Sequence, residues 1–535
     1  MKRWGSGWGA SPLGSAAHAA ASASVPAARE PTWRRDAEGR RRADLGNGQF
    51  LNPVLPGDHP DPTLLKDGSD YYATFSSFDA TPGLVIWHSR DLVNWAPVGP
   101  ALEEPLGTVF AADLVKHGNR YYVYIPFIPA PWSQRLPDTS SIHVIHAEDI
   151  RGPWSAPIDL GIRGYIDPGH VVGEDGRRYL FLSGVARVRL SEDGLATDGA
   201  IEHAYDGWRY PDEWITEAYA LEGPKLFRRG GWFYLISAVG GTSGPATGHM
   251  VIAARSRSVH GPWENCPHNP IVRTRSVAER WWSRGHATLL EGPGGGHWLA
   301  YHGYENGYRS LGRQLLLEPV QWDADGWFRA RGGDLSKPLS MPAVVANPDA
   351  LPAWSDDFRA SAFGTRWNFF AASPAEKQRA RIADGTLRLQ GKGTGPADCS
   401  PLVGMSGDRA YECSVELEIE GAAQGALLLF FNSRLFLGMG FDGERMTTYL
   451  GGTTSFWQEP VPRSRTLHLR IVNDRQVVTF HHSLDGRQWT RHGVRGEVSG
   501  YNANTVADLQ SLRPALCAIG VGAVRFRNYR YRGLP

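Results

Sequence analysis

Short apolar segments alternate with Gly- and Asp-rich turns from about residue 50 to residue 340. Five times, an apolar segment carrying one polar residue precedes a turn and a strand-like run around an aromatic residue. The first two copies read "HPDPTLLKDGSDYYATFSS" and "FAADLVKHGNRYYVYIPF". The aromatic positions, at steps of 50, 58, 54 and 65 residues, are Tyr71, Tyr121, Tyr179, Phe233 and Trp298. Strand repeats of about 50 residues predict an all-β fold, a five-bladed β-propeller with a four-stranded sheet per blade.

The alternative is a β-sandwich in which the similarity between segments is accidental. Five copies in the same phase argue against it, and no comparable helical period interrupts this region. In a propeller, the first strand of each blade lines the central axis. One polar residue falls at a similar phase of each first segment: Asp61, Asp113, Asp167, Glu222 and His286. We therefore expect these side chains to converge on one funnel, with Asp113 as the member most readily explained as structural.

A second strand-rich region follows the repeats. The stretch "VVANPDALPAWSDDF" has the Pro, Asn and Asp content of a linker. Beyond it, alternating segments such as "YECSVELEIEG" and "RTLHLRIV" are typical of a jelly-roll β-sandwich. The predicted domains are residues 1–47, a leader that is disordered or partly helical, 48–343, the propeller, 344–355, the linker, and 356–535, the sandwich.

Composition excludes several classes of function. The formal net charge is +1, from 56 basic and 55 acidic residues, so we expect no nucleic-acid partner. No run of 18 apolar residues occurs, so no membrane span is expected. The first 30 residues are too rich in Gly and Ser for a convincing secretion signal, which favours a disordered leader and a cytoplasmic protein. Four cysteines allow at most one disulfide, in the C-terminal part.

Asp61 stands between Pro60 and Pro62 at the entry to a predicted buried strand. Proline on both sides predicts an extended backbone there and removes local donors for the carboxylate. Buried carboxylates are costly unless they are paired or used. Two carboxylates facing each other across a sugar, one ionised and one protonated, are the machinery of glycoside hydrolysis. A third acid nearby raises the pKa of the protonated one by like-charge repulsion.

Several motifs, in order, resemble glycoside hydrolase family 43, whose members are five-bladed propeller enzymes acting on xylan and arabinan side chains with inversion. They are "NPVLPGDHPDPTLL", "GLVIWHSRDLVNW", "YIDPGHVV", "EGPKLF", "RGHATLL" and "LGRQLLLEPVQWDADGW". The C-terminal region resembles the concanavalin-like domain attached to many xylosidases of this family. We expect that domain to pack against the propeller and shape the pocket rim rather than to bind sugar.

The resemblance implies a role for each matching residue. The general base falls on Asp61, the general acid on Glu222, and the aspartate that orients the acid and modulates its pKa on Asp167. Substrate contacts fall on Arg313, Phe110 and His59, where Phe110 replaces an aromatic that is often Trp and His59 stands where β-xylosidases usually carry Asn. His286 falls on a histidine that sits beside a calcium ion or water at the axis. The resemblance implies no required cofactor and allows a structural Ca²⁺ at the axis, held through water.

Each of these positions also has a simpler reading. Asp61 could cap a turn, Asp167 could form an Asx-turn, and Glu222 could pair with Lys225. His286 could be a core histidine with satisfied hydrogen bonds.

The predicted function is an inverting, exo-acting hydrolase releasing terminal β-D-xylose or α-L-arabinofuranose from plant cell-wall oligosaccharides. The alternatives are a non-catalytic carbohydrate-binding propeller and, less favoured, a scaffold for protein partners. The sequence decides neither between the two sugars nor the oligomeric state.

Overall fold

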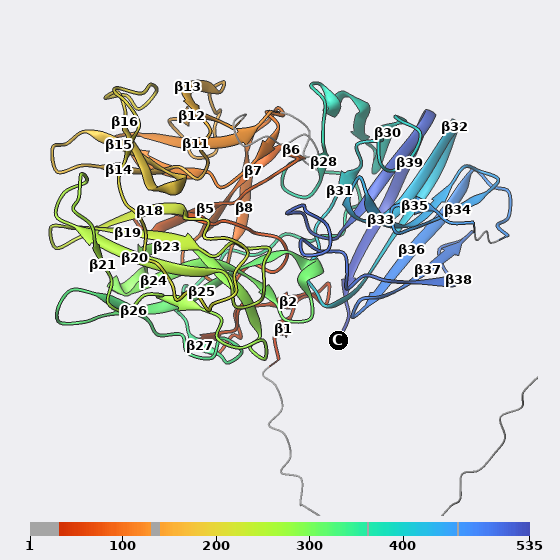
Figure 1. Ribbon diagram of the computed structural model, residues 1–535. Coiled ribbons are helices and arrows are strands. Elements are labelled where there is room, and N and C mark those ends of the chain that lie inside the picture. Colours follow the sequence, from red (N-terminus) through yellow and green to blue (C-terminus); the bar gives the residue numbers. More distant parts are fainter. Residues whose placement is uncertain (1–31, 130–139, 361–362, 457–459) are drawn as a thin grey trace, which may run out of the picture. The chain divides into compact units, whose positions relative to one another are not determined.

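The protein is described here from a computed structural model, which covers residues 32–129, 140–360, 363–456 and 460–535. Five antiparallel sheets form a five-bladed β-propeller, as predicted (Figure 1). The first strands of the blades are β4 (Thr63–Asp67), β10 (Asp113–His117), β14 (Gly169–Val172), β18 (Glu222–Arg229) and β23 (Trp281–Glu291). Each contacts the first strand of the next blade, and β23 contacts β4, so these strands close a ring around the axis.

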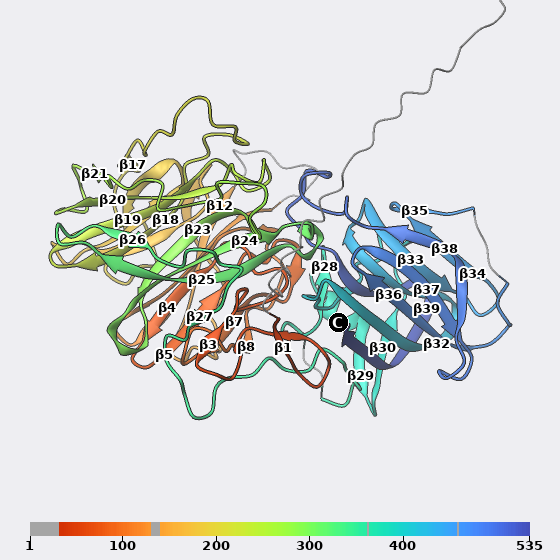
Figure 2. The same ribbon diagram turned by 90° about the horizontal axis from the view of Figure 1, so that it is seen from below.

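The outer strands of each blade follow in chain order, and Figure 2 labels several of them from below. The second strands, which carry the five predicted aromatic positions, are β5 (Asp70–Thr74), β11 (Arg120–Ile128), β15 (Arg178–Leu182), β19 (Trp232–Val239) and β24 (His297–Glu305). The third strands are β7 (Gly83–Ser89), β12 (Ser141–Ala147), β16 (Ala186–Arg189), β20 (Met250–Ser256) and β25 (Arg313–Trp322). The fourth strands are β8 (Ala96–Leu102), β13 (Ile158–Arg163), β17 (Glu202–His203), β21 (Glu264–Asn265) and β26 (Phe328–Ala330). All five aromatic side chains are buried, because this strand is covered by sheets on both sides.

Short elements complete the propeller. β9 (Thr108–Val109) pairs with β11, and β22 (Val272–Arg273) pairs with β20. β3 (Gln49–Phe50) pairs with β27 (Leu339–Ser340) and so ties the beginning of the propeller to its end. Helical structure in the described residues is limited to short 3₁₀ turns such as η3 (Ser183–Val185), η4 (Pro293–Gly295), η5 (Arg309–Leu311) and η6 (Glu376–Arg379). In this part of the chain no helix is long and apolar enough to cross a membrane.

The C-terminal β-sandwich is built on two very long strands, β32 (Ala410–Asn432) and β39 (Arg513–Gly533). The two strands pair with each other along nearly their whole length. On its other edge, the first half of β32 pairs with one strand and the second half with another, so the two long strands take part in both layers of the sandwich. The other strands are β28 (Asn368–Phe370), β29 (Ala380–Ala383), β30 (Thr386–Gln390), β31 (Leu402–Val403), β33 (Leu435–Phe441), β34 (Met446–Leu450), β35 (Thr453–Thr454), β36 (Thr466–Asp474), β37 (Val477–Ser483) and β38 (Thr490–Glu497).

Alternation along the sandwich strands builds the core. In β36, the side chains of Leu467, Leu469 and Ile471 are buried, and the residues between them are partly exposed. This period of two is what a strand with one face on a core requires. One sheet continues into the propeller, because β28 pairs with β6 (Ala80–Thr81). Cys266, Cys399, Cys413 and Cys517 are buried and free, so the disulfide that the sequence allowed is not formed.

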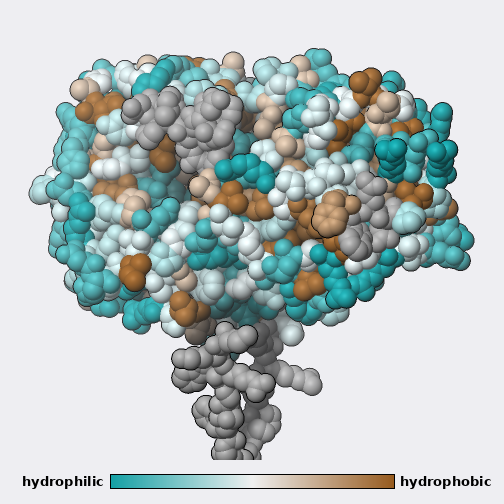
Figure 3. All heavy atoms as spheres, turned by 45° about the vertical axis from the view of Figure 1, so that its right-hand side comes forward, coloured by the Kyte–Doolittle hydropathy of each residue, from teal (hydrophilic) through white to brown (hydrophobic). Residues whose placement is uncertain are grey.

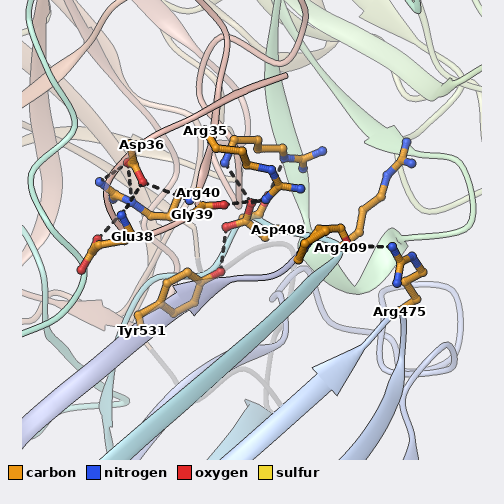
Figure 4. A network of polar contacts seen from close by, with 12 residues as sticks. Arg35, Asp36, Glu38, Gly39, Arg40, Asp408, Arg409, Arg475 and Tyr531 are labelled. Carbon is orange, nitrogen blue, oxygen red and sulfur yellow. Dashed lines mark hydrogen bonds and ion pairs between the residues drawn. The ribbon is translucent and has the colours of Figure 1, made fainter. Parts of the chain in front are cut away.

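The structure of residues 34–42 differs from the prediction for the lead-in. The lead-in was expected to be disordered or partly helical, but β1 (Arg34–Arg35) and β2 (Arg41–Arg42) form a hairpin. Tertiary contacts override local helix propensity here. Arg35 binds the Asp408 carboxylate, which also accepts from Tyr531 of the sandwich (Figure 4). The backbone N–H of Arg41 donates to the same carboxylate. Residues 1–31 of the predicted leader lie outside the described residues.

Large hydrophobic side chains on the surface are dispersed. Figure 3 shows hydrophobic residues scattered among hydrophilic ones on one face. Those that are exposed in the described chain are Ile215, Val277, Val344, Phe456, Val477, Leu484 and Val521. Phe456 is the single aromatic residue in this set, and sugar-binding platforms usually need more than one. The described part of the sandwich therefore offers no extended aromatic platform.

Candidate active site

The predicted site residues lie at one end of the first strands. Asp61 and Asp167 come just before β4 and β14, Glu222 begins β18, and His286 lies within β23. They line one open cavity of about 220 Å³ together with Arg313, the first residue of β25. Its other walls are Phe110, Ala111, Ile166, Glu217, Ala218, Ala220, Gly241, Thr242, Ser243 and Leu509. The convergence expected from the repeat phase is therefore present for four of the five polar positions.

Backbone conformation at three of these residues is unusual. Asp61, Asp167 and His286 have φ angles of 56°, 55° and 58°, in the left-handed region. This corrects the extended backbone predicted for Asp61, because aspartate tolerates this conformation even between two prolines. Non-glycine residues in this region cost free energy and persist where the surrounding contacts fix them. All three residues lie where the chain brings their side chains to the propeller axis.

Asp61 is held as a carboxylate by its partners. Arg313 Nη1 lies 2.8 Å from Asp61 Oδ1, and the Ser76 hydroxyl donates to Oδ2 at 2.6 Å. Its backbone N–H donates to Nδ1 of His302 at 3.0 Å. Burial alone would raise the pKa of Asp61, but the Arg313 guanidinium holds it well below its ordinary value. Asp61 is thus the ionised member of the cluster, and its simpler reading as a turn cap does not account for these contacts.

Glu222 has the opposite electrostatic environment. Burial, followed by the charges of Asp167 and Asp61, raises the pKa of Glu222 well above its ordinary value. Burial and Asp61 also raise the pKa of Asp167, against a hydrogen bond that its Oδ2 accepts from the Gly223 N–H at 3.0 Å. The Glu222 carboxyl makes no hydrogen bond or ion pair with the described residues, so it can meet a ligand. One cavity therefore holds an ionised and a protonated carboxyl together.

Lys225 does not pair with Glu222. Its ammonium group lies 2.6 Å from Asp113 Oδ1 and donates to the carbonyls of Ala112 and Pro168. Asp113 also accepts from the Thr63 hydroxyl at 3.0 Å, and it lines a different cavity. The buried pair neutralises Asp113, in agreement with the structural role expected for it.

His59 is not brought to the cavity. Its ring is buried edge-on between Phe75 and Trp87, at centroid distances of 4.9 Å and 5.2 Å, and it lines a separate small cavity. Its Nδ1 lies 3.2 Å from the Gly57 carbonyl oxygen, and burial lowers the pKa of His59 to about 4. A direct substrate contact for His59, which the resemblance implied, has no geometric basis here.

The sequence profile of the glycosyl hydrolases family 43 matches residues 50–328, just over half of the chain. The chain belongs to this family. It is 26% identical over 503 residues to a xylan 1,3-beta-xylosidase of a Vibrio species, covering 83% of this chain and 90% of that protein. It is 30% identical over 371 residues to the non-reducing end alpha-L-arabinofuranosidase BoGH43B of Bacteroides ovatus, covering 65% and 66% of the two chains.

The likeness extends through the sandwich. The crystal structure of the family 43 protein BlXynB of Bacillus licheniformis superposes with a TM-score of 0.79 at 25% identity, covering 91% of this chain and 100% of that one. The protein is accordingly a glycoside hydrolase with both the propeller and the C-terminal sandwich of its relatives.

The hydrolase cavity includes residues that sequence reasoning missed. Leu509 comes from the segment between β38 and β39 of the sandwich and packs with Phe78, Phe110 and Ile166 at the cavity. Thr242 lies 3.2 Å from Nε2 of His302, which links it to the backbone of Asp61. None of these residues repeats at the period of the blades, so no pattern in the sequence marked them.

His286 does not have the surroundings of a direct metal ligand. Its Nε2 is buried without a hydrogen-bond partner among the described protein atoms, and burial lowers the pKa of His286 to about 3. Calcium takes six to eight oxygen ligands, yet no group of three or more His, Cys, Asp or Glu residues in the described ranges could hold a metal. The residues present do not fit directly bound Ca²⁺, and a calcium held through water stays a prediction.

A three-way ion pair around the buried Glu305 carboxylate supports the segment that leads to Asp61. Glu305, at the end of β24, binds Arg41 of the N-terminal hairpin at 2.8 Å and Arg409 of the sandwich at 2.6 Å. Arg41 also donates to the side-chain oxygen of Gln314, which accepts from the Gly57 N–H, four residues before Asp61. The hairpin, propeller and sandwich therefore meet at one carboxylate that supports the chain leading to Asp61.

Replacing Glu305 with Gln should lower the free energy of unfolding by about 3–5 kcal/mol, because the buried Arg41 guanidinium and the partly exposed Arg409 guanidinium lose their shared counter-charge. Burial alone would raise the pKa of Glu305, but the two arginines hold it at about 2. The contribution of the native carboxylate should therefore be complete above about pH 5 and fade as pH falls from about 4 toward 2. Thermal or urea unfolding across this pH range measures both effects.

Glu444→Gln is the matched control, since Glu444 and Arg463 form an exposed pair at 3.9 Å and such pairs contribute little. Equal, small losses in both variants would contradict a supporting role for the three-way ion pair.

Proposed function

We propose that this family 43 hydrolase is an inverting, exo-acting pentosidase that releases terminal β-D-xylose or α-L-arabinofuranose from plant cell-wall oligosaccharides. The observation that carries the proposal is the divergence of two carboxyls in one cavity. Asp61 has a lowered pKa and Glu222 a raised pKa. Pairs of acids whose environments push their pKa values apart are the usual general base and general acid.

In this mechanism, a water molecule between Asp61 and the sugar gives a proton to the Asp61 carboxylate as its oxygen attacks the anomeric carbon. Glu222 gives its proton to the glycosidic oxygen, which leaves as the hydroxyl of the remaining sugar. An inverting arrangement needs room for that water, with carboxyls about 6.5–9.5 Å apart. Asp167 keeps Glu222 protonated through its charge, and Arg313 keeps Asp61 ionised while facing the cavity.

The size of the cavity supports exo action. About 220 Å³ accommodates one sugar ring rather than a polysaccharide chain, and Leu509 of the sandwich contributes to its wall. The names of the relatives support both sugars, since one is a xylosidase and another an arabinofuranosidase. A non-catalytic sugar-binding propeller is the second candidate, but binding alone gives no reason to hold one acid ionised and another protonated.

Asp61→Asn and Glu222→Gln should each lower kcat by roughly two orders of magnitude or more, because each removes one proton transfer. The hydrolysis of 4-nitrophenyl β-D-xyloside and 4-nitrophenyl α-L-arabinofuranoside measures this and shows which sugar is preferred. Circular dichroism controls for folding. Near-normal turnover by a folded variant would remove that residue from its assigned role.

The first-formed sugar should have the opposite anomeric configuration to the substrate. Proton NMR during the first minutes of hydrolysis of a xylo- or arabino-oligosaccharide, before mutarotation, reports the anomer. Retention would exclude direct attack by water and would require a covalent intermediate instead. Release of disaccharides before monosaccharides would argue against exo action.

Asp167→Asn should move the alkaline limb of the pH profile of kcat/KM to lower pH and leave the acid limb nearly in place. The substitution removes a negative charge that raises the pKa of Glu222, whose deprotonation sets the alkaline limb, whereas the acid limb reports Asp61. Substrates with a good leaving group need little protonation and should be affected less. An unmoved alkaline limb with a higher KM would make Asp167 a binding residue.

A further inference from the structure

A fourth carboxylate at the cavity transfers no proton in the proposed mechanism. Glu217 precedes β18 by five residues and lines the cavity from its exposed side, whereas Asp61, Asp167 and Arg313 are buried. Its backbone N–H donates to the Gly240 carbonyl at 3.0 Å, and the Gly240 N–H donates to Tyr219, so the segment extends along the end of β19. Glu217 therefore has a defined place at the mouth.

The Glu217 side chain is fixed against the loop 241–244. Its Oε2 accepts from the Ser243 N–H at 2.6 Å. A Cβ atom at Gly241 would lie 2.6 Å from that same oxygen, and one at Gly244 would lie 2.7 Å from Glu217 Cβ. A side chain at either position would collide with Glu217, so the two glycines let the loop lie close against this residue.

The loop itself is held from two other elements. The Gly244 carbonyl accepts from Asn504 of the sandwich at 3.1 Å and from Arg309 of η5 at 3.3 Å. A carboxylate anchored to a loop that is fixed in this way keeps its position when a ligand arrives. It loses little side-chain entropy on binding, which favours a recognition role.

The charge of Glu217 is uncompensated. The ionisable residues that line the cavity are Asp61, Asp167, Glu217, Glu222, His286 and Arg313. Arg313 is committed to Asp61, and burial keeps His286 neutral. Glu217 itself has no ion pair among the described residues, and its Oε1 accepts no hydrogen bond from them. The mouth therefore presents one negative charge and one available acceptor to whatever extends out of the cavity.

We propose that Glu217 determines specificity on the leaving-group side. Its free oxygen accepts a hydroxyl from a neutral leaving sugar, and its charge disfavours leaving groups that carry a carboxylate, such as uronic-acid-substituted units. The assignment to the leaving-group side rests on the proposed function: Glu222 faces the leaving oxygen, and Glu217 lies on the exposed side of the same cavity, close enough for its charge to act on Glu222.

The test compares two aryl pentosides of the preferred sugar, one with a 4-(carboxymethyl)phenyl leaving group and one with its neutral carboxamide. The wild-type enzyme should prefer the amide by about fivefold or more in kcat/KM at low salt. The preference should shrink as ionic strength rises, because the interaction is between exposed charges. Glu217→Gln keeps an oxygen for the Ser243 N–H, removes the charge, and should bring the ratio close to one.

Glu213→Gln is the matched control, since Glu213 is exposed on the same segment but does not line the cavity. It should retain the wild-type ratio. With the unmodified disaccharide as substrate, Glu217→Ala should raise KM several-fold and change kcat little, whereas a merely structural role would lower the unfolding temperature and leave the charge preference intact.

Two failures are distinguishable. Wild-type enzyme that hydrolyses neither aryl pentoside would overturn the proposed function, and the inference with it. Wild-type enzyme that hydrolyses both equally, or a preference that Glu217→Gln and Glu213→Gln change alike, would overturn the role of Glu217 alone.

Discussion

The contact between Asp61 and Arg313 is the interaction on which the rest of the site depends. It joins the entry of the first blade to the third strand of the last blade, across the point where the ring of inner strands closes. A carboxylate this deeply buried would ordinarily be protonated, and the guanidinium keeps it ionised. Burial, with the Asp61 charge as a further cause, raises the pKa values of Asp167 and Glu222. Together with burial, this ion pair therefore influences the protonation of all three acids.

The fold supports this ion pair from several directions. Glu305 connects the N-terminal hairpin, the propeller and the sandwich, and Gln314 connects this contact to the chain before Asp61 by a hydrogen bond. A second buried ion pair, between Asp113 and Lys225, neutralises the carboxylate of the second blade. From the sandwich, Leu509 forms part of the cavity wall, and Asn504 donates a hydrogen bond to the loop at the cavity. The sandwich therefore acts on the site through packing and hydrogen bonds, as expected for a rim domain.

Prediction failed where contacts distant in sequence overrode local rules. Flanking prolines predicted an extended backbone at Asp61. Its backbone instead lies in the left-handed region, and its polar groups bind Arg313, Ser76 and His302. The Arg-rich stretch before residue 48 was expected to be disordered or partly helical, yet Asp408 and Glu305 supply the partners that make it a hairpin. His59 was placed near substrate by resemblance and is buried between two aromatic rings.

The sequence by itself determined the repeat, the propeller, the sandwich and the four polar residues that converge on the cavity, because a residue at one phase of every inner strand must face the common axis. Only the tertiary structure decided that Lys225 neutralises Asp113 rather than Glu222, and that Glu217, Thr242 and Leu509 complete the cavity. Those outcomes depend on burial and on distances between segments far apart in the chain. Neither quantity is encoded in the period of a single strand.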